Sequence, residues 1–263
     1  MSQAVSRERL PDADTLLRTS TKSRYGISAD VYILEDGNFL KIFPASYEKS
    51  RIEWEKMLLA HLSHMQVPRI VGSFSTQRGE AILYERLDGT HPFEPSMPQL
   101  ARIGAFLAGV HDYGKKALAQ SDFANYAPAY ELPAVARHFE KLRRRIDFEP
   151  RRETILHCDP FPDNILFVGE RLSGFIDFSD ASLGDPRFDL GVALMSMCMD
   201  EDRVDRGRAE ALLEGYGGVY SADSLEGAVD FALFHYMAKR LDMGKKSYLK
   251  LYEILTKRLK KRS

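Results

Sequence analysis

The chain has 263 residues, a formal net charge of -1 from 37 Lys and Arg against 38 Asp and Glu, a hydrophobic fraction of 44% and two cysteines. This composition excludes a wholly disordered chain and a disulfide framework. No apolar run approaches the roughly 20 residues that cross a bilayer, and the N-terminal segment lacks the apolar core of a secretory signal, so we expect a cytoplasmic protein without a membrane partner. Because the positive and negative charges balance, we do not expect a nucleic-acid partner. The oligomeric state stays open.

Short strands dominate the first part of the chain. Three apolar runs are typical of strands: residues 30–35, 39–43 and 81–85. The cluster Asp36-Gly37-Asn38 between the first two runs is a turn former, and it predicts a hairpin. One helix is expected over about residues 50–65, closed by Val67-Pro68.

The pattern becomes mostly helical after about residue 90. Apolar stripes at spacings of three and four residues start at Leu100, Leu225 and Tyr248, and Gly114 is the expected end of the first of these helices. One hairpin interrupts them, with strands at residues 165–168 and 172–177. Gly169-Glu170 between these strands suits a type II′ turn.

This change of character divides the sequence into two parts. It predicts an α+β fold with a small β-rich lobe over residues 1–88. A larger, mostly helical lobe is expected over residues 89–263.

Four polar residues stand at the ends of the second hairpin. His157, Asp159 and Asn164 precede its first strand, and Asp177 ends its second strand. A hairpin brings its two ends together, so Asn164 and Asp177 should lie close. Their amide and carboxylate oxygens suit Mg²⁺, which takes few protein ligands and completes its shell with phosphate and water. Asp159 could then orient a hydroxyl nucleophile or accept its proton.

The pattern His-x-Asp-x-x-x-x-Asn, followed by a hairpin that ends in Ile-Asp-Phe, resembles the aminoglycoside phosphotransferase and choline kinase superfamily. The likeness covers about residues 20–200. It implies a bilobal protein-kinase-like fold and transfer of the γ-phosphoryl group of ATP, with Mg²⁺, to a hydroxyl of a small molecule. By this resemblance Asp159 is the catalytic aspartate, Asn164 and Asp177 bind Mg²⁺, and His157 supports the loop.

A lysine and a glutamate in the first lobe fit the same interpretation. Lys41 lies mid-strand among apolar residues, where an ammonium is costly unless it is paired or reaches solvent. Glu55 shares a helix face with Ile52 and Leu59, and a carboxylate there needs a cation. The two resemble the kinase ion pair that sets the lysine against the α- and β-phosphates. A solvent-facing Lys41 is the alternative, and Glu53 is the other candidate partner.

Three weaker signals complete the resemblance. Gly26 and Ser28, before the lysine strand, are similar to the loop that covers the nucleotide phosphates. The strand end at residues 85–87 resembles the hinge where backbone groups of Glu85 and Leu87 would pair with adenine. Asp189 resembles the aspartate that braces the catalytic loop.

The acceptor stays open at this point. An aminoglycoside would favour an acidic pocket, for which Asp163, Asp180 and Asp185 are available, whereas homoserine, choline or another metabolite would fit equally. Cys158 stands where the family usually has glycine. We therefore expect thiol reagents to reach the catalytic loop and slow turnover.

Two further functions remain as alternatives. One is a catalytically idle nucleotide-binding regulator. The other is a nucleic-acid-associated protein that uses the basic runs at residues 141–145 and 257–262, although solvated helix ends explain those runs more simply.

Overall fold

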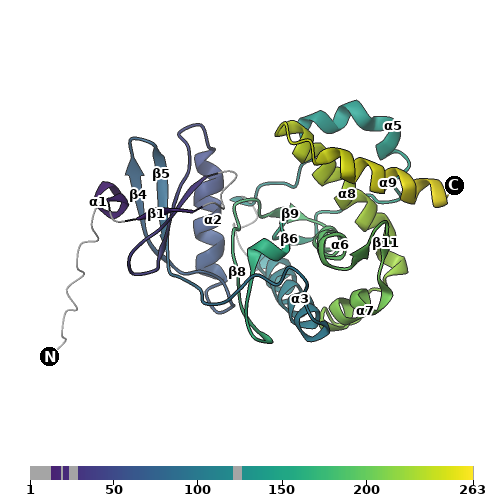
Figure 1. The fold of residues 1–263 in the computed structure, drawn as a ribbon, viewed down its shortest axis with the longest axis horizontal. Coiled ribbons are helices and arrows are strands. Elements are labelled where there is room, and N and C mark those ends of the chain that lie inside the picture. Colours follow the sequence, from purple (N-terminus) through teal and green to yellow (C-terminus); the bar gives the residue numbers. More distant parts are fainter. Residues whose placement is uncertain (1–12, 19, 24–28, 121–125, 263) are drawn as a thin grey trace. The chain divides into compact units, whose positions relative to one another are not determined.

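The computed structural model describes residues 13–18, 20–23, 29–120 and 126–262. The chain divides into two compact units, residues 1–87 and residues 88–263, and each of them is described by itself (Figure 1).

The N-terminal unit is built on one antiparallel sheet with the strand order β1-β2-β3-β5-β4. Its strands are β1 (Thr21–Lys22), β2 (Asp30–Ile33), β3 (Phe39–Ile42), β4 (Ile70–Thr76) and β5 (Gly79–Tyr84). Its helices are α1 (Ala13–Leu17) and α2 (Lys49–His61). The expected hairpin is confirmed, because β2 pairs with β3. Its turn has Gly37 at φ 86, a conformation that glycine adopts without strain.

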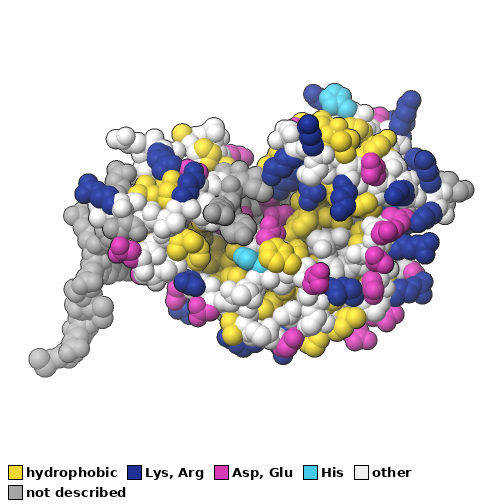
Figure 2. All heavy atoms as spheres, in the orientation of Figure 1, with side chains coloured by type: hydrophobic (Ala, Val, Ile, Leu, Met, Phe, Trp, Pro, Cys, Tyr) yellow, Lys and Arg dark blue, Asp and Glu magenta, His cyan; other side chains and the backbone are white. Residues whose placement is uncertain are grey.

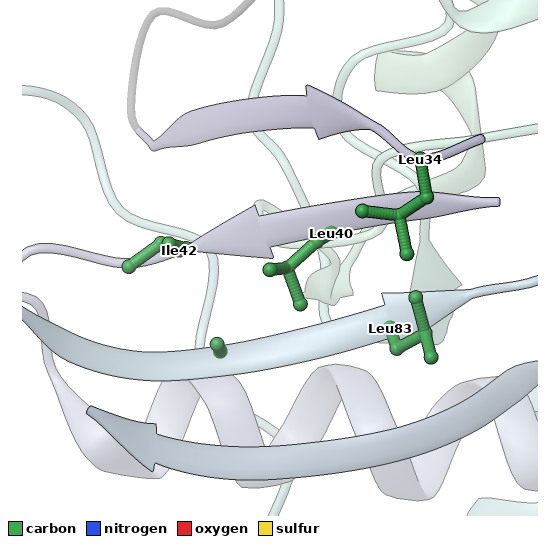
Figure 3. Packing of buried hydrophobic residues seen from close by; sticks show 5 residues of the cluster. Leu34, Leu40, Ile42 and Leu83 are labelled. Carbon is green, nitrogen blue, oxygen red and sulfur yellow. The ribbon is translucent and has the colours of Figure 1, made fainter. Parts of the chain in front are cut away.

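One face of this sheet carries a small apolar core. Leu40 lies opposite Leu83, and Ile42 lies opposite Ala81, in the register of β3 and β5. Figure 3 shows these side chains with Leu34 on one side of the strands. Because side chains alternate along a strand, Lys41 points to the opposite face.

Two expectations for this unit need correction. The helix expected over residues 50–65 ends at His61, four residues early. Strand β4 was not expected, although its side chains alternate between half-buried and exposed along the whole strand. Gly72, Ser73 and Ser75 interrupt its apolar pattern. The strand therefore depends on its hydrogen-bonded pairing with β5.

The C-terminal unit is mainly helical. Its longer helices are α3 (Met97–Gln120), α6 (Pro186–Met197), α7 (Arg206–Gly215), α8 (Glu226–Asp242) and α9 (Tyr248–Lys261). Its short helices are η1 (Ala134–Phe139), α5 (Glu140–Arg143), η2 (Pro162–Asn164) and η3 (Asp223–Leu225). Its strands are β6 (Thr154–Leu156), β7 (Ile165–Val168), β8 (Arg171–Phe175), β9 (Ser182–Gly184), β10 (Met199–Asp200) and β11 (Arg203–Val204).

Helix α8 lies at the centre of this packing. It contacts both α6 and α9, and α3 packs against α7 and β6 (Figure 1). Eleven successive residues of α8, from Ala228 to Ala238, are buried. A helix enclosed in this way gives a rigid support to anything that its side chains hold.

Gly114 does not end the first of these helices, as the sequence had suggested. Helix α3 runs through it to Gln120. A Cβ at position 114 would lie 2.4 Å from Oγ1 of Thr154 and 2.5 Å from N of Ile155. The missing side chain at Gly114 therefore lets α3 pack closely against β6, and the helix does not end there. Among the described helices, none combines the length and the apolar character needed to span a bilayer.

Candidate active site

The hairpin of β7 and β8 sets the position of two candidate ligands. Val168 pairs with Arg171 across the expected two-residue turn, where Gly169 has φ 59. At the open end, the N–H of Ile176 donates to the carbonyl of Asn164 at 2.9 Å. This bond continues the pairing beyond Ile165 and Phe175, so Asn164 lies beside the residue that precedes Asp177. The structure thus brings together the two residues that the sequence predicted to be close.

Asp159 is held at both carboxylate oxygens. Nδ2 of Asn164 donates to Oδ2 of Asp159 at 2.8 Å and to its backbone oxygen at 2.9 Å. The hydroxyl of Tyr236 lies 2.6 Å from Oδ1 of Asp159. Burial raises the pKa of Asp159, and the ammonium of Lys239 partly opposes that rise. The carboxylate is therefore oriented by neighbours before any substrate arrives.

His157 ties the loop to the hairpin. Its Nδ1 accepts the N–H of Asp159 at 3.2 Å, and its Nε2 lies 3.1 Å from the carbonyl of Ile176. This arrangement assigns a neutral ring protonated at Nε2, since Nδ1 accepts and Nε2 faces an acceptor. The ring is fully buried against Phe178. Both ring nitrogens of His157 thus contact backbone groups of the loop and the hairpin, which suits support of the loop.

Asp189 holds the backbone of the same loop by hydrogen bonds. Its two oxygens accept the backbone N–H groups of His157 at 2.7 Å and Cys158 at 2.8 Å. Nε2 of His111 lies 3.1 Å from Oδ2 of Asp189, and all of these groups are buried. A carboxylate that accepts two successive amides fixes the backbone path of the loop, including Cys158 at φ 67.

The residues at the hairpin end fit a magnesium ion. Nδ2 of Asn164 donates to Oδ2 of Asp159, so the amide oxygen of Asn164 points away from Asp159. Strand β8 ends at Phe175, two residues before the strand end that the sequence predicted, so Asp177 lies beyond the strand, with φ 63. Its Oδ1 accepts the hydroxyl of Ser179. In the part of the chain that the structure describes, no group of three or more His, Cys, Asp or Glu is gathered for a metal. A hard cation with two protein oxygens, completed by phosphate and water, agrees with that donor set.

In the N-terminal unit, Lys41 and Glu55 lie together. Nζ of Lys41 is 3.7 Å from Oε2 of Glu55, and the residues are 8% and 1% exposed. The hydroxyl of Tyr84 donates to Oε1 of Glu55 at 3.0 Å. Glu53 is exposed and pairs with Lys56 at 2.9 Å. Glu55 is thus the partner of the lysine, and Lys41 does not face solvent.

We expect Glu55→Ala to lower the free energy of unfolding by about 3–5 kcal/mol, because it leaves a buried ammonium without its carboxylate. Glu53→Ala is the matched control on the same helix, and a change within about 0.5 kcal/mol is expected there. Urea denaturation measures both. Equal effects for the two variants would contradict a stabilising role of the buried pair.

The remaining nucleotide candidates are Gly26, Ser28, Glu85 and Leu87. Gly26 and Ser28 lie outside the described residues. Glu85 is exposed, and its N–H donates to the carbonyl of Arg69 at 2.8 Å, so that amide is already used. The N–H of Arg86 donates to Oδ1 of Asn38. Of this segment, the backbone of half-buried Leu87 and the carbonyl of Glu85 stay as candidates.

Known proteins resemble the chain in sequence. A family model described as the phosphotransferase enzyme family matches residues 24–226, well over half of the sequence. The chain belongs to this family. It is 39% identical to the homoserine kinase of Brucella anthropi over 93 residues, which are 33% of this chain and 28% of that one. It is 29% identical to the homoserine kinase of Afipia carboxidovorans over 213 residues, 69% of this chain and 63% of that one. The chain thus spans less than two thirds of these curated relatives.

Solved structures share the fold of this phosphotransferase family member. The GDP complex of aminoglycoside 2'-phosphotransferase-IIIa superposes with a TM-score of 0.69 at 17% identity, over 93% of both chains. Choline kinase LicA from Streptococcus pneumoniae gives 0.65 at 15% identity, over 93% of this chain and 95% of that chain. The expected α+β, protein-kinase-like fold is confirmed.

Cys158 of this phosphotransferase family member is not the reactive thiol that its place in the loop suggested. It is 6% exposed, and burial, with the negative charges of Asp189 and Asp180, raises its pKa well above the ordinary value. Cys198 is also buried, with a pKa raised to about 12. Both thiols stay protonated at neutral pH, which suppresses their nucleophilicity.

We therefore expect iodoacetamide to modify the native protein at neutral pH at least about 100-fold more slowly than the urea-unfolded protein, because only thiolates react. Mass spectrometry of timed samples measures the rates. Stoichiometric labelling of Cys158 in the native state would restore the original expectation.

The three acidic residues considered for an acidic acceptor pocket are not left as open, unmatched charges. Asp163 is exposed, and Asp180 pairs with Lys239 at 2.5 Å. Asp185 is buried, caps α6 and pairs with Arg187 at 2.6 Å. Two of the three carboxylates are thus matched by cations.

Several cations of the two basic runs are paired with acids. In the run at residues 141–145, Arg143 pairs with Glu149 and Arg144 with Glu140. Arg258 and Arg262 pair with Glu226 and Asp230, and Lys261 pairs with Asp202. Figure 2 shows Lys and Arg interspersed with Asp and Glu over the C-terminal unit on the face in view. Such pairing joins α9 to α8, and it lowers the positive potential that a nucleic acid would need.

Tyr236 and Lys239 are the site neighbours that sequence reasoning missed. Tyr236 belongs to the apolar helix stripe that starts at Leu225, and the stripe alone assigned it no role at the site. The available signal was its hydroxyl, because a tyrosine on a buried stripe must find a hydrogen-bond partner.

Proposed function

We propose that this chain transfers the γ-phosphoryl group of ATP to a hydroxyl of a small molecule. One observation carries the proposal: a half-buried aspartate, held at both oxygens, stands on a braced loop next to a hairpin end with an amide and a carboxylate. Membership of the phosphotransferase enzyme family supports it. Phosphoryl transfer needs positioning and charge neutralisation more than covalent help, and this arrangement offers both.

In the C-terminal unit, Asp159 would orient the acceptor hydroxyl and take its proton as the new P–O bond forms. The bond from the γ-phosphorus to the bridging oxygen breaks at the same time, and ADP leaves with that oxygen. Each oxygen of Asp159 has a second lone-pair site beyond its present partner, so it can still accept that hydrogen bond. Asn164 and Asp177 would hold Mg²⁺, which when bound neutralises phosphate charge. His157 and Asp189 would keep the loop in place.

In the N-terminal unit, Lys41 would contact the α- and β-phosphates, with Glu55 setting its direction. Buried Tyr84 supports this role, because its hydrogen bond leaves Glu55 little rotational freedom. Gly26 and Ser28 would cover the phosphates. The carbonyl of Glu85 and the backbone of Leu87 would pair with the base.

The acceptor would be an antibiotic such as an aminoglycoside, or a metabolite such as homoserine or choline. The similar sequences named homoserine kinase favour the metabolite. The pairing of Asp180 with Lys239 also disfavours a polycationic acceptor, since part of the negative charge is already matched.

The decisive experiment is a screen of hydroxyl-bearing metabolites and antibiotics with Mg-ATP, followed by ³¹P NMR of the products. Transfer to one acceptor supports the proposal. Nucleotide binding without transfer to any acceptor would favour the idle regulator, and salt-dependent binding of DNA or RNA would favour the nucleic-acid function.

A further inference from the structure

One polar side chain of helix α8 contacts the loop that carries Asp159. This is the hydroxyl of Tyr236, whose residue is 4% exposed. Its oxygen lies 2.6 Å from Oδ1 of Asp159 and 2.6 Å from the backbone oxygen of Cys158. The ring packs edge-on against Phe161, with centroids 4.7 Å apart. Packing therefore fixes where the hydroxyl lies.

Tyr236 and Asn164 form a matched pair around the aspartate. Each contacts one carboxylate oxygen of Asp159 and one backbone oxygen of the loop. Asn164 belongs to the loop itself, whereas Tyr236 comes from a helix 77 positions away. Among the hydrogen bonds to this carboxylate from the described residues, the one from Tyr236 links it to a buried helix of the unit.

The single proton of the tyrosine hydroxyl faces two acceptors, and the charged carboxylate of Asp159 is a stronger acceptor than the carbonyl of Cys158. Burial, and next the negative charge of Asp159, raises the pKa of Tyr236 well above its ordinary value, so the hydroxyl keeps its proton. Lys239 lies one turn further along α8, with its ammonium 5.5 Å from the centre of the tyrosine ring. The contact between a cation and a ring face adds to the packing that holds the ring.

We propose that Tyr236 is the positioning residue that holds the Asp159 carboxylate in the orientation required for transfer. This inference rests on the proposed function. A loop aspartate can rotate about two side-chain bonds, and a misplacement of about 1 Å costs on the order of 100-fold in rate. Tyr236 removes that freedom because α8 is packed against both α6 and α9.

The test compares Tyr236→Phe with Tyr130→Phe. Both variants remove one tyrosine hydroxyl with a 2.6 Å contact, but the partner of Tyr130 is Nδ1 of His235 and not Asp159. Tyr236→Phe should lower kcat about 10- to 100-fold with an unchanged KM for nucleotide, because orientation is lost while binding is not. Tyr130→Phe should stay within about twofold of the original kcat, since the helix and loop keep their packing. Equal kcat values for the two variants would overturn the proposal.

A second measurement does not depend on activity. Thermal unfolding is recorded for Tyr236→Phe, Asp159→Ala and the double variant. The two Tm shifts should not add, because both substitutions remove the same contact. Additive shifts would overturn the proposed contact. If the shifts do not add and the original protein transfers phosphate to no acceptor, the contact stands and the proposed function fails.

Discussion

Asp159→Ala is expected to lower kcat by about 10³-fold or more, because it removes the carboxylate that we propose orients and deprotonates the acceptor hydroxyl. Nucleotide affinity should survive, since the proposed phosphate and metal contacts lie on other residues. Steady-state phosphate transfer gives kcat, and calorimetry gives the nucleotide Kd.

Asp163→Ala is the matched control. Asp163 lies on the same loop, four residues on, but is exposed. Its removal should leave kcat within about twofold, as for most exposed positions. Ordinary turnover in Asp159→Ala would reject Asp159 as the catalytic residue.

Asp177→Ala is expected to abolish the part of nucleotide affinity that depends on Mg²⁺. A charge-assisted contact contributes about 1.5–3 kcal/mol, so Kd should rise by about 10- to 100-fold in the presence of Mg²⁺ and little in EDTA. Because Asp177 has φ 63, alanine also strains the backbone there. Asp177→Asn tolerates this conformation and isolates the loss of charge.

Glu170→Gln provides the control for that experiment. Glu170 is an exposed acid at the turn of the same hairpin, away from its open end. Its nucleotide affinity should be unchanged with and without EDTA. If Asp177→Asn keeps the original Kd in Mg²⁺ and loses affinity in EDTA to the same extent as the original protein, the metal assignment is refuted.

Local sequence was informative where chemistry depends on near neighbours. The loop from His157 to Asn164 and the hairpin to Asp177 span few residues. Turn chemistry at Gly169-Glu170 starts the pairing, which shifts by one residue between Leu166 and Phe167. The hairpin end could therefore be predicted without a fold. Strand β4 could not, since its residues have weak strand preference and depend on pairing with β5.

Burial explains the choices that the sequence left open. Glu53 and Glu55 are two residues apart on one helix, and either could face the lysine from periodicity alone. The sheet buries Glu55 and leaves Glu53 exposed. Cys158 was misjudged for the same reason, because a thiol in a catalytic loop is reactive only when it can ionise.

The sequence by itself determined the family resemblance, the loop and hairpin with Asp159, Asn164 and Asp177, and the mostly helical second part. These features arise from short-range spacing and turn preference. Only the tertiary structure decided that Glu55 accompanies Lys41, that Gly114 serves contact with β6, and that Tyr236 reaches Asp159 from α8. Such contacts join residues far apart in the chain, and close packing selects them by shape and by the need to satisfy buried polar groups.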